Sequence, residues 1–201
     1  MNGRVFYAVI LSVAFLCASL ACAQDQDSTI VSIQFHPIYS ASGLASDALQ
    51  LKVGVEVGKP TWLDRLLPHG SLHLVLHHYS GPDPADEGLP GAGGVYGWLA
   101  FSEKLESYTG LLLGVKQYYG KTRRNFNGLW TEGLLGLYTA ECEGERLAAN
   151  ALQVAFGYKF RALDRLELEP MFEFGVVRSS DWVWGFSGDI GIVTGYRVAT
   201  Y

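Results

Sequence analysis

Apolar and polar residues alternate along most of this chain, and the segment Leu49–Gly58 shows the pattern most clearly. Its odd-numbered positions are all aliphatic, whereas its even-numbered positions are polar, charged or glycine. Because successive side chains of a strand point to opposite faces, this segment predicts a strand with one apolar and one polar face. Its length also matches the about 9–11 residues that a tilted strand needs to cross a bilayer.

Seven further segments repeat this alternation: 29–40, 71–79, 108–119, 129–139, 152–161, 166–176 and 188–201. Eight such ribbons predict an all-β chain folded as an antiparallel transmembrane β-barrel. Segment 95–102 alternates too, but a bacterial barrel of one chain normally has an even number of strands. We therefore interpret 95–102 as an ordered part of the long loop that begins at residue 80, and a ten-stranded barrel is the alternative.

The first 23 residues differ from the rest and predict a signal peptide, which leaves a single barrel domain over residues 24–201. A positively charged start at Arg4 precedes a long apolar run, and Ala21-Cys22-Ala23 forms a small-x-small cleavage signal. The alternatives are an uncleaved helical anchor and a lipoprotein with Cys22 as its lipidated residue. Cleavage after Ala23 would leave Cys142 as the only cysteine, so no disulfide within the chain is expected.

The composition favours a membrane barrel and argues against several other classes of protein. Glycine is frequent at 24 residues, aromatic residues make up 13% of the chain, and charged residues only 17%. A net charge of −5 without a basic stripe argues against nucleic-acid binding. No phosphate loop or paired cysteine ligand set occurs, so we expect no cofactor.

His73 and His77 lie about 13 Å apart along one strand, too far for one metal ion, and a site would need His36 from another strand.

Alternation alone does not tell which face points outward. A soluble, secreted lipocalin-like binding barrel would show a similar pattern with its apolar face pointing inward. Charges of both signs and many glycines share the polar face, as expected of a narrow lumen. Aromatic residues gather near the predicted strand ends, where an interfacial girdle belongs; they are Tyr39, Tyr79, Tyr108, Tyr118, Tyr119, Trp130, Tyr158, Phe160, Trp182 and Trp184. We therefore expect the apolar face to contact lipid.

With that sense, the polar face predicts a network of charges inside the barrel. Its members are Lys52, Glu56, Lys116, Glu132, Lys159, Arg161, Glu167, Glu169, Glu173, Asp189 and Arg197. Isolated charges in a confined lumen are costly, so most are expected to pair and to fill it. We interpret the glycines on this face as positions that relieve crowding. A small polar side chain at Gly54 is therefore expected to be tolerated better than an arginine at the neighbouring Val53.

Three segments carry a resemblance to a known family: Gly195-Tyr196-Arg197-Val198-Ala199-Thr200-Tyr201, Gly157-Tyr158-Lys159-Phe160 and Leu163-Asp164-Arg165-Leu166. With the signal peptide, they resemble the small OmpX/OmpW-like outer-membrane barrels. The resemblance implies that Tyr201 is an assembly signal, read by the barrel-assembly machinery. The apolar positions of the last strand have the opposite parity to Tyr201, and a bulge near its end would reconcile them.

One short element suggests an enzymatic alternative. His78 and Ser80 share parity with the apolar face, and Asp83, Asp86 and Glu87 follow in the loop. A serine beside a histidine and an acid could hydrolyse a lipid ester. The element resembles the His-x-Ser of outer-membrane lipid A deacylases, although Gly81 stands where those enzymes have asparagine.

The sequence as a whole predicts a small, non-enzymatic and monomeric protein of the cell outer membrane. Its expected partners are outer-membrane lipid, the assembly machinery and extracellular ligands that reach the 80–94 loop. The expected role is structural, surface-interacting or concerned with a small apolar solute, and the pattern does not choose among these. The lipid-ester hydrolase and the soluble binding barrel remain as alternatives.

Overall fold

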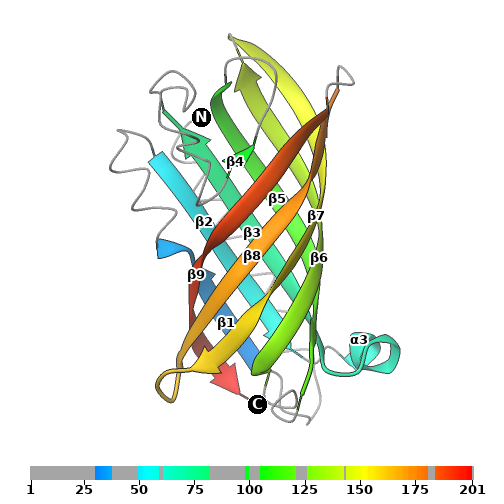
Figure 1. Ribbon diagram of the computed structural model, residues 1–201, viewed down its shortest axis with the longest axis vertical. Helices are drawn as coiled ribbons and strands as arrows, with labels where there is room; N and C mark the ends of the chain where they lie inside the picture. Colours follow the sequence, from blue (N-terminus) through cyan, green and yellow to red (C-terminus); the bar gives the residue numbers. More distant parts are fainter. Residues whose placement is uncertain are drawn as a thin grey trace.

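The computed structural model describes residues 30–37, 49–58, 61–81, 98–99, 105–120, 126–142, 144–180 and 184–200. Eight tilted strands close into an antiparallel barrel (Figure 1), which confirms the predicted fold class. The strands are β1 (Ile30–Phe35), β2 (Leu49–Gly58), β3 (Gly70–Ser80), β5 (Leu105–Tyr118), β6 (Gly128–Cys142), β7 (Glu145–Arg161), β8 (Leu166–Ser179) and β9 (Trp184–Thr200). The predicted cleavage site at Ala23, the anchor and lipoprotein alternatives at 1–23, and Tyr201 lie outside the described residues.

Each long strand pairs with the next along the chain, and β1 pairs with β9 to close the barrel. β1 is short and covers only the part of β9 from Thr194 to Thr200. A two-residue strand, β4 (Trp98–Leu99), pairs with β9 at Gly188 and Ser187, beyond the end of β1. Part of segment 95–102 is therefore joined to the barrel wall without forming another full strand. The ten-stranded alternative is wrong.

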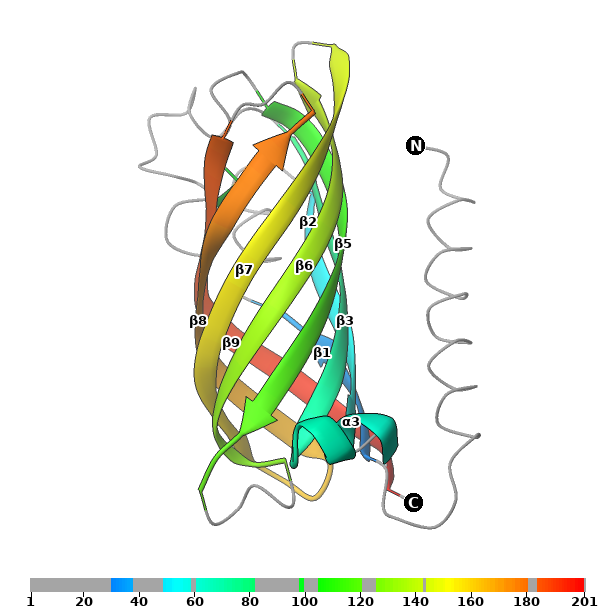
Figure 2. The ribbon, with the colours of Figure 1, turned by 90° about the vertical axis from the view of Figure 1, so that its right-hand side faces the viewer.

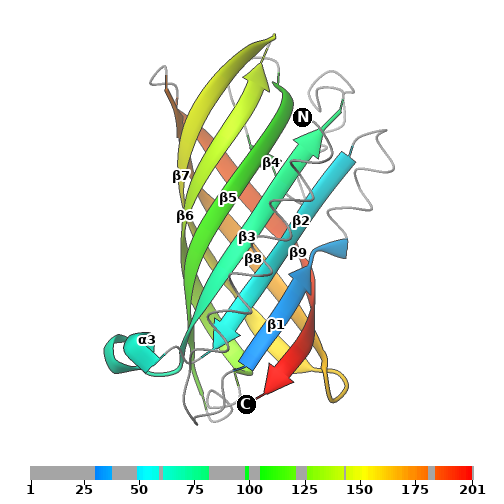
Figure 3. The same ribbon diagram turned by 180° about the vertical axis from the view of Figure 1, so that it is seen from behind.

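The two ends of the barrel differ. We call the end where β1 begins and β9 ends the termini end, and the opposite one the loop end (Figure 1). Helix α3 (Thr61–Leu66) lies at the termini end (Figure 2) and projects beside the barrel wall (Figure 1). The short β7–β8 turn lies at the same end, on the other side of the barrel (Figures 1 and 3). In the described part of the chain, no helix is long and apolar enough to span a membrane.

Side chains alternate between the interior and the outer surface along the long strands. On β6, Leu134 is 2% exposed and points inward, whereas its neighbour Leu135 is 65% exposed. The outer face is apolar on every long strand; examples are Ile33, Leu113, Leu137, Phe156, Phe174 and Ile190. The polar face lines the interior, so the apolar side of the sheet is its exposed side, as predicted.

Two irregularities occur in the strands, and the first is the predicted bulge near the end of the last strand. The pairing of β1 with β9 shifts between Val31 and Ser32, which places a bulge at the end of β9 and reverses the parity from Ala199 onward. Pro170 lies within β8, and the β7–β8 pairing is interrupted beside it, between Gly157–Met171 and Phe160–Leu168. Proline has no N–H to donate to the ladder, which accounts for this interruption.

The predicted aromatic girdle needs correction. Tyr79, Tyr108, Tyr118 and Trp130 are buried in the interior, whereas Tyr119, Tyr158 and Phe160 are exposed on the outer face. Each buried ring has the same parity as the polar positions of its strand; Tyr118, for instance, follows Lys116 by two residues. Nearness to a strand end was therefore the wrong criterion. Tyr39, Trp182 and the Trp184 side chain lie outside the described residues.

Close packing inside the wall predicts that Gly157→Ala destabilises the barrel. A Cβ at Gly157 would lie 2.5 Å from the Pro170 carbonyl oxygen and 2.7 Å from Trp130 Cζ2. Overpacking of this kind typically costs about 1–3 kcal/mol. A urea titration of the protein refolded in detergent micelles should show this loss. Gly133→Ala is the control, because its Cβ would meet nothing within 4 Å. An equal response of the two variants would contradict the described packing.

Candidate functional site

The structure buries all the predicted luminal charges except Arg161. Arg161 has the right parity, but it is the last residue of β7 and is exposed at the termini end. The expectation that Arg161 joins the network is therefore wrong, because parity does not show where a strand passes the rim. The other ten predicted residues are each at most 6% exposed.

Glu56 on β2 is the centre of a charge cluster in the half of the lumen nearest the termini end. Its Oε1 accepts hydrogen bonds from Ser71 Oγ and Tyr118 OH, both at 2.6 Å. Its Oε2 lies 2.6 Å from Lys159 Nζ and accepts a bond from Gln34 Nε2 at 2.7 Å. These donors come from β1, β3, β5 and β7, so a single carboxylate connects four strands to β2.

Two more carboxylates, Glu167 and Glu169, enter the same cluster from β8. Glu169 lies 2.9 Å from Lys116 Nζ and 2.8 Å from Lys159 Nζ. Glu167 accepts bonds from Arg197 Nε at 2.9 Å and from Ser32 Oγ at 2.7 Å. Leu168 between them faces the other side of the sheet, so strand alternation alone brings both acids into the lumen.

Charge is balanced in this cluster. Three cations, Lys116, Lys159 and Arg197, face three carboxylates, Glu56, Glu167 and Glu169, and all six groups are buried. Buried ions must find partners and hydrogen bonds to offset the loss of hydration. The Lys116 ammonium also lies 4.2 Å from the centre of the Trp130 ring, which brings β6 into contact with the cluster.

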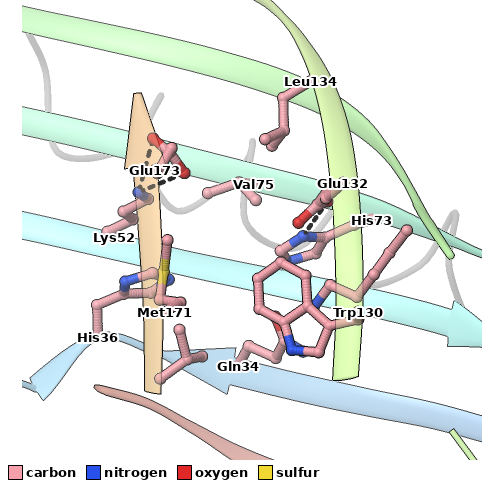
Figure 4. Close-up of a pocket in the computed structure, with 12 residues that line it drawn as sticks. Gln34, His36, Lys52, His73, Val75, Trp130, Glu132, Leu134, Met171 and Glu173 are labelled. Atoms are coloured by element: carbon pink, nitrogen blue, oxygen red, sulfur yellow. Dashed lines mark hydrogen bonds and ion pairs between the residues drawn. The ribbon is translucent and has the colours of Figure 1, made fainter. Parts of the chain in front are cut away.

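A second group of charges lies nearer the loop end and is not balanced by lysine or arginine alone. Lys52 Nζ lies 2.8 Å from Asp189 and 3.1 Å from Glu173. His73 Nδ1 lies 2.7 Å from Glu132 Oε1 (Figure 4), and His36 Nδ1 lies 3.5 Å from Asp189. Lys52 therefore meets two of the three acids, while His73 contacts the third, Glu132, and His36 lies near Asp189.

A small cavity separates the two groups of charges. Gln34, His73 and Trp130 line it together with Lys52 and Glu173 (Figure 4). Its volume of about 10 Å³ is the room of one water molecule. Gln34 Oε1, His73 Nε2 and Trp130 Nε1 are buried without a protein hydrogen-bond partner. This polar cavity suits a water molecule, and it is too small for a solute.

Aromatic side chains fill the lumen on both sides of the charges. Toward the loop end, His77 lies 3.0 Å from the Tyr108 hydroxyl and 3.2 Å from the Tyr138 hydroxyl. Toward the termini end, the ring centres of Tyr118 and Phe126 lie 5.4 Å apart, and Phe126 is 2% exposed. Between these layers the charges are in contact, so the interior is a packed core.

Glycines make room for these large side chains, and Gly54 is an example. A Cβ at Gly54 would lie 2.6 Å from His73 Nε2 and 3.2 Å from the Leu74 carbonyl oxygen. Even a small side chain there would displace the imidazole. Gly54 therefore accommodates His73, and the lower cost expected at Gly54 than for Val53→Arg stays a prediction.

The candidate residues of the hydrolase alternative lie near the loop end of β3. His78 Nδ1 is 2.9 Å from Thr109 Oγ1 on β5, and Ser80 is exposed at the end of the strand. The candidate acids Asp83, Asp86 and Glu87 lie outside the described residues, so the triad has no described geometry. Among the described residues, no group of three or more histidine, cysteine, aspartate or glutamate side chains could hold a metal ion.

Sequence reasoning missed the neutral members of the cluster. Ser32, Gln34, Ser71 and Tyr118 each donate to a buried carboxylate. The sequence does contain a signal for two of them. Tyr118 has the same parity as the predicted luminal Lys116 on its own strand, and Gln34 the same parity as the luminal charges of the neighbouring strand β2. The prediction considered only formal charge and therefore left out these donors.

Comparisons with known proteins find similarity at the level of structure. No protein-family model matches the sequence, and no curated protein matches it. The crystal structure of Neisserial surface protein A is similar, with 8% sequence identity and a TM-score of 0.47. The match covers 85% of this chain and 96% of that chain.

The charge cluster predicts a large effect of Lys159→Met. Lys159 contacts Glu56, Glu167 and Glu169, and its loss would leave three buried carboxylates with two cations. Breaking a buried ion pair by removing one partner costs about 3–5 kcal/mol. Unfolding of the micelle-bound protein in urea, followed by tryptophan fluorescence, measures this cost.

Arg161→Met provides a matched control on the same strand, two residues away. Arg161 is exposed, so its replacement should change the free energy of unfolding by less than about 0.5 kcal/mol. Equal unfolding midpoints for the two variants would show that the buried charges are not held by mutual pairing.

Proposed function

We propose that this chain is a small, non-enzymatic outer-membrane β-barrel whose lumen is filled by side chains. One observation carries the proposal: the exposed face of the closed sheet is apolar all the way round, while the charged face is buried. Soluble monomers rarely expose contiguous apolar patches of more than a few hundred Å². Lipid contact gives this surface a suitable solvent, and closure of the barrel pairs most of the strand edges, which lipid cannot satisfy.

The polar positions on the outer face support a fixed orientation in the membrane. In the described strands, the charged side chains with outward parity are Glu141, Arg146 and Arg178, and all lie near the loop end. The apolar band thus reaches the termini end and stops short of the loop end. Outer-membrane barrels have short periplasmic turns and longer extracellular loops. We therefore assign the termini end to the periplasm and the loop end to the cell exterior.

The filled interior argues for a structural or surface-interacting role. An eight-stranded barrel is only wide enough for its own side chains, and here ion pairs and aromatic rings occupy that space. An apolar solute would have to displace buried charge, so transport through the lumen is disfavoured. The extracellular loops, including 80–94, are left as the part of the protein that would meet a partner.

Cell fractionation tests the location. The protein should co-sediment with outer membranes, resist extraction by carbonate, and migrate faster on gels when unheated than after boiling. Release as a soluble periplasmic or secreted protein would favour the lipocalin-like alternative. A Ser80→Ala variant that changes lipid A acylation in cells would favour the hydrolase alternative.

Leu135→Arg should destabilise the barrel in a bilayer. Leu135 is 65% exposed in the middle of β6, so in water an arginine would be harmless there. An arginine facing lipid near the bilayer midplane costs about 2–4 kcal/mol. Thr139→Arg, on the same face nearer the loop end, should cost about 0–1 kcal/mol. Chemical denaturation in lipid vesicles distinguishes these values, and equal costs would refute the assigned lipid face.

The packed lumen predicts that the purified wild-type protein forms no stable conducting pore. Phe126 at one end and the His77–Tyr108–Tyr138 contacts toward the other leave no continuous path along the described interior. Planar bilayer recordings should show a silent membrane after verified insertion. Reproducible large conductance steps would contradict the filled lumen.

A further inference from the structure

The described turns at the termini end carry a net positive charge. Their charged residues are Arg65, Arg161 and Arg165 against Asp64 and Asp164. A positive end of this kind favours an anionic surface as its neighbour.

The β7–β8 turn presents part of this positive charge beside an exposed apolar residue. Arg161 and Arg165 flank the turn, and Leu163 at its tip is 69% exposed. Together with Asp164, Leu166 and the Tyr196 ring, they line a shallow depression. The single acid leaves the turn with a net positive charge.

Backbone hydrogen bonds hold the turn against the barrel. Ala162 N donates to Leu166 O at 2.9 Å, and Arg197 N donates to Arg165 O at 2.8 Å. The second bond ties the turn to β9, the strand that carries Tyr196. The two guanidinium groups therefore extend from a fixed backbone, which lowers the entropic cost of binding a ligand between them.

Exposed aromatic rings place this depression at the level of lipid headgroups. Tyr158, Phe160 and Tyr196 face outward near the C-terminal ends of β7 and β9, and each is at least 42% exposed. Tyrosine on the outer face of a barrel marks the membrane–water interface.

We infer that the β7–β8 turn binds the headgroup of an anionic phospholipid, with its phosphate between Arg161 and Arg165 and its acyl chains beside the Tyr196 ring. Arginine suits this ligand because its planar, permanently charged group donates several hydrogen bonds to phosphate oxygens. The inference rests on the proposed membrane location and adds a ligand class and a leaflet to it. The leaflet is the one at the termini end.

Native mass spectrometry of the folded protein in neutral detergent tests this site directly. Phosphatidylglycerol should bind in preference to phosphatidylcholine, and the preference should fall as salt is added. The double variant Arg161→Gln/Arg165→Gln should bind phosphatidylglycerol about 30-fold more weakly at low ionic strength, because each basic residue near an anionic lipid contributes about 1 kcal/mol.

Arg146→Gln/Arg178→Gln at the loop end is the matched control and should keep the preference. Equal binding of the two phospholipids by the wild type, or an equal loss in both double variants, would overturn the inference. Faster gel migration before heating verifies folding, and Arg165→Gln alone serves if the double variant does not fold. A folded protein that enters no bilayer would refute the proposed function, whereas insertion without lipid preference would refute only this site.

Discussion

The pairing of charge inside a closed sheet is the constraint on which this structure depends. Glu56 accepts from side chains of β1, β3, β5 and β7, while Glu167 and Glu169 add β8 and, through Arg197, β9. Only a closed barrel brings these strands within hydrogen-bond distance of one another. Closure and charge pairing are therefore coupled: an open sheet would expose the apolar face on one side and leave unpaired ions on the other.

This arrangement reverses the usual distribution of residues in a water-soluble protein. Leu135 and Leu137 are exposed, while Lys52, Lys116 and Lys159 are among the largest fully buried side chains. The polar core fixes the register, because sliding a strand by one residue would turn its charges toward the outer surface. Glycines complete the fit by leaving space for His73 at Gly54 and for Trp130 at Gly157.

The sequence predicted the strands and the faces well because alternation is a local property that a single strand already displays. The sequence-based prediction failed where the position of a side chain depends on neighbouring strands. Arg161 has luminal parity but lies beyond the rim, and β4 pairs with β9 only because β1 is short. Tyr118 and Trp130 were assigned to the membrane interface although their parity places them inside. The tightness at Gly54 depends on His73 of another strand, which alternation does not reveal.

On β6 the odd-numbered side chains face outward and the even-numbered ones face the packed interior, so the proposed function places lipid against the odd-numbered face. Spin labels placed singly at residues 131–139 of the bilayer-reconstituted protein measure this most directly, through collisions with oxygen and with a water-soluble nickel chelate. We expect high oxygen and low nickel accessibility at 133, 135 and 137, and low accessibility to both at 132, 134 and 136. High nickel accessibility at 133, 135 and 137, or the absence of a two-residue period, would show that this face does not contact lipid.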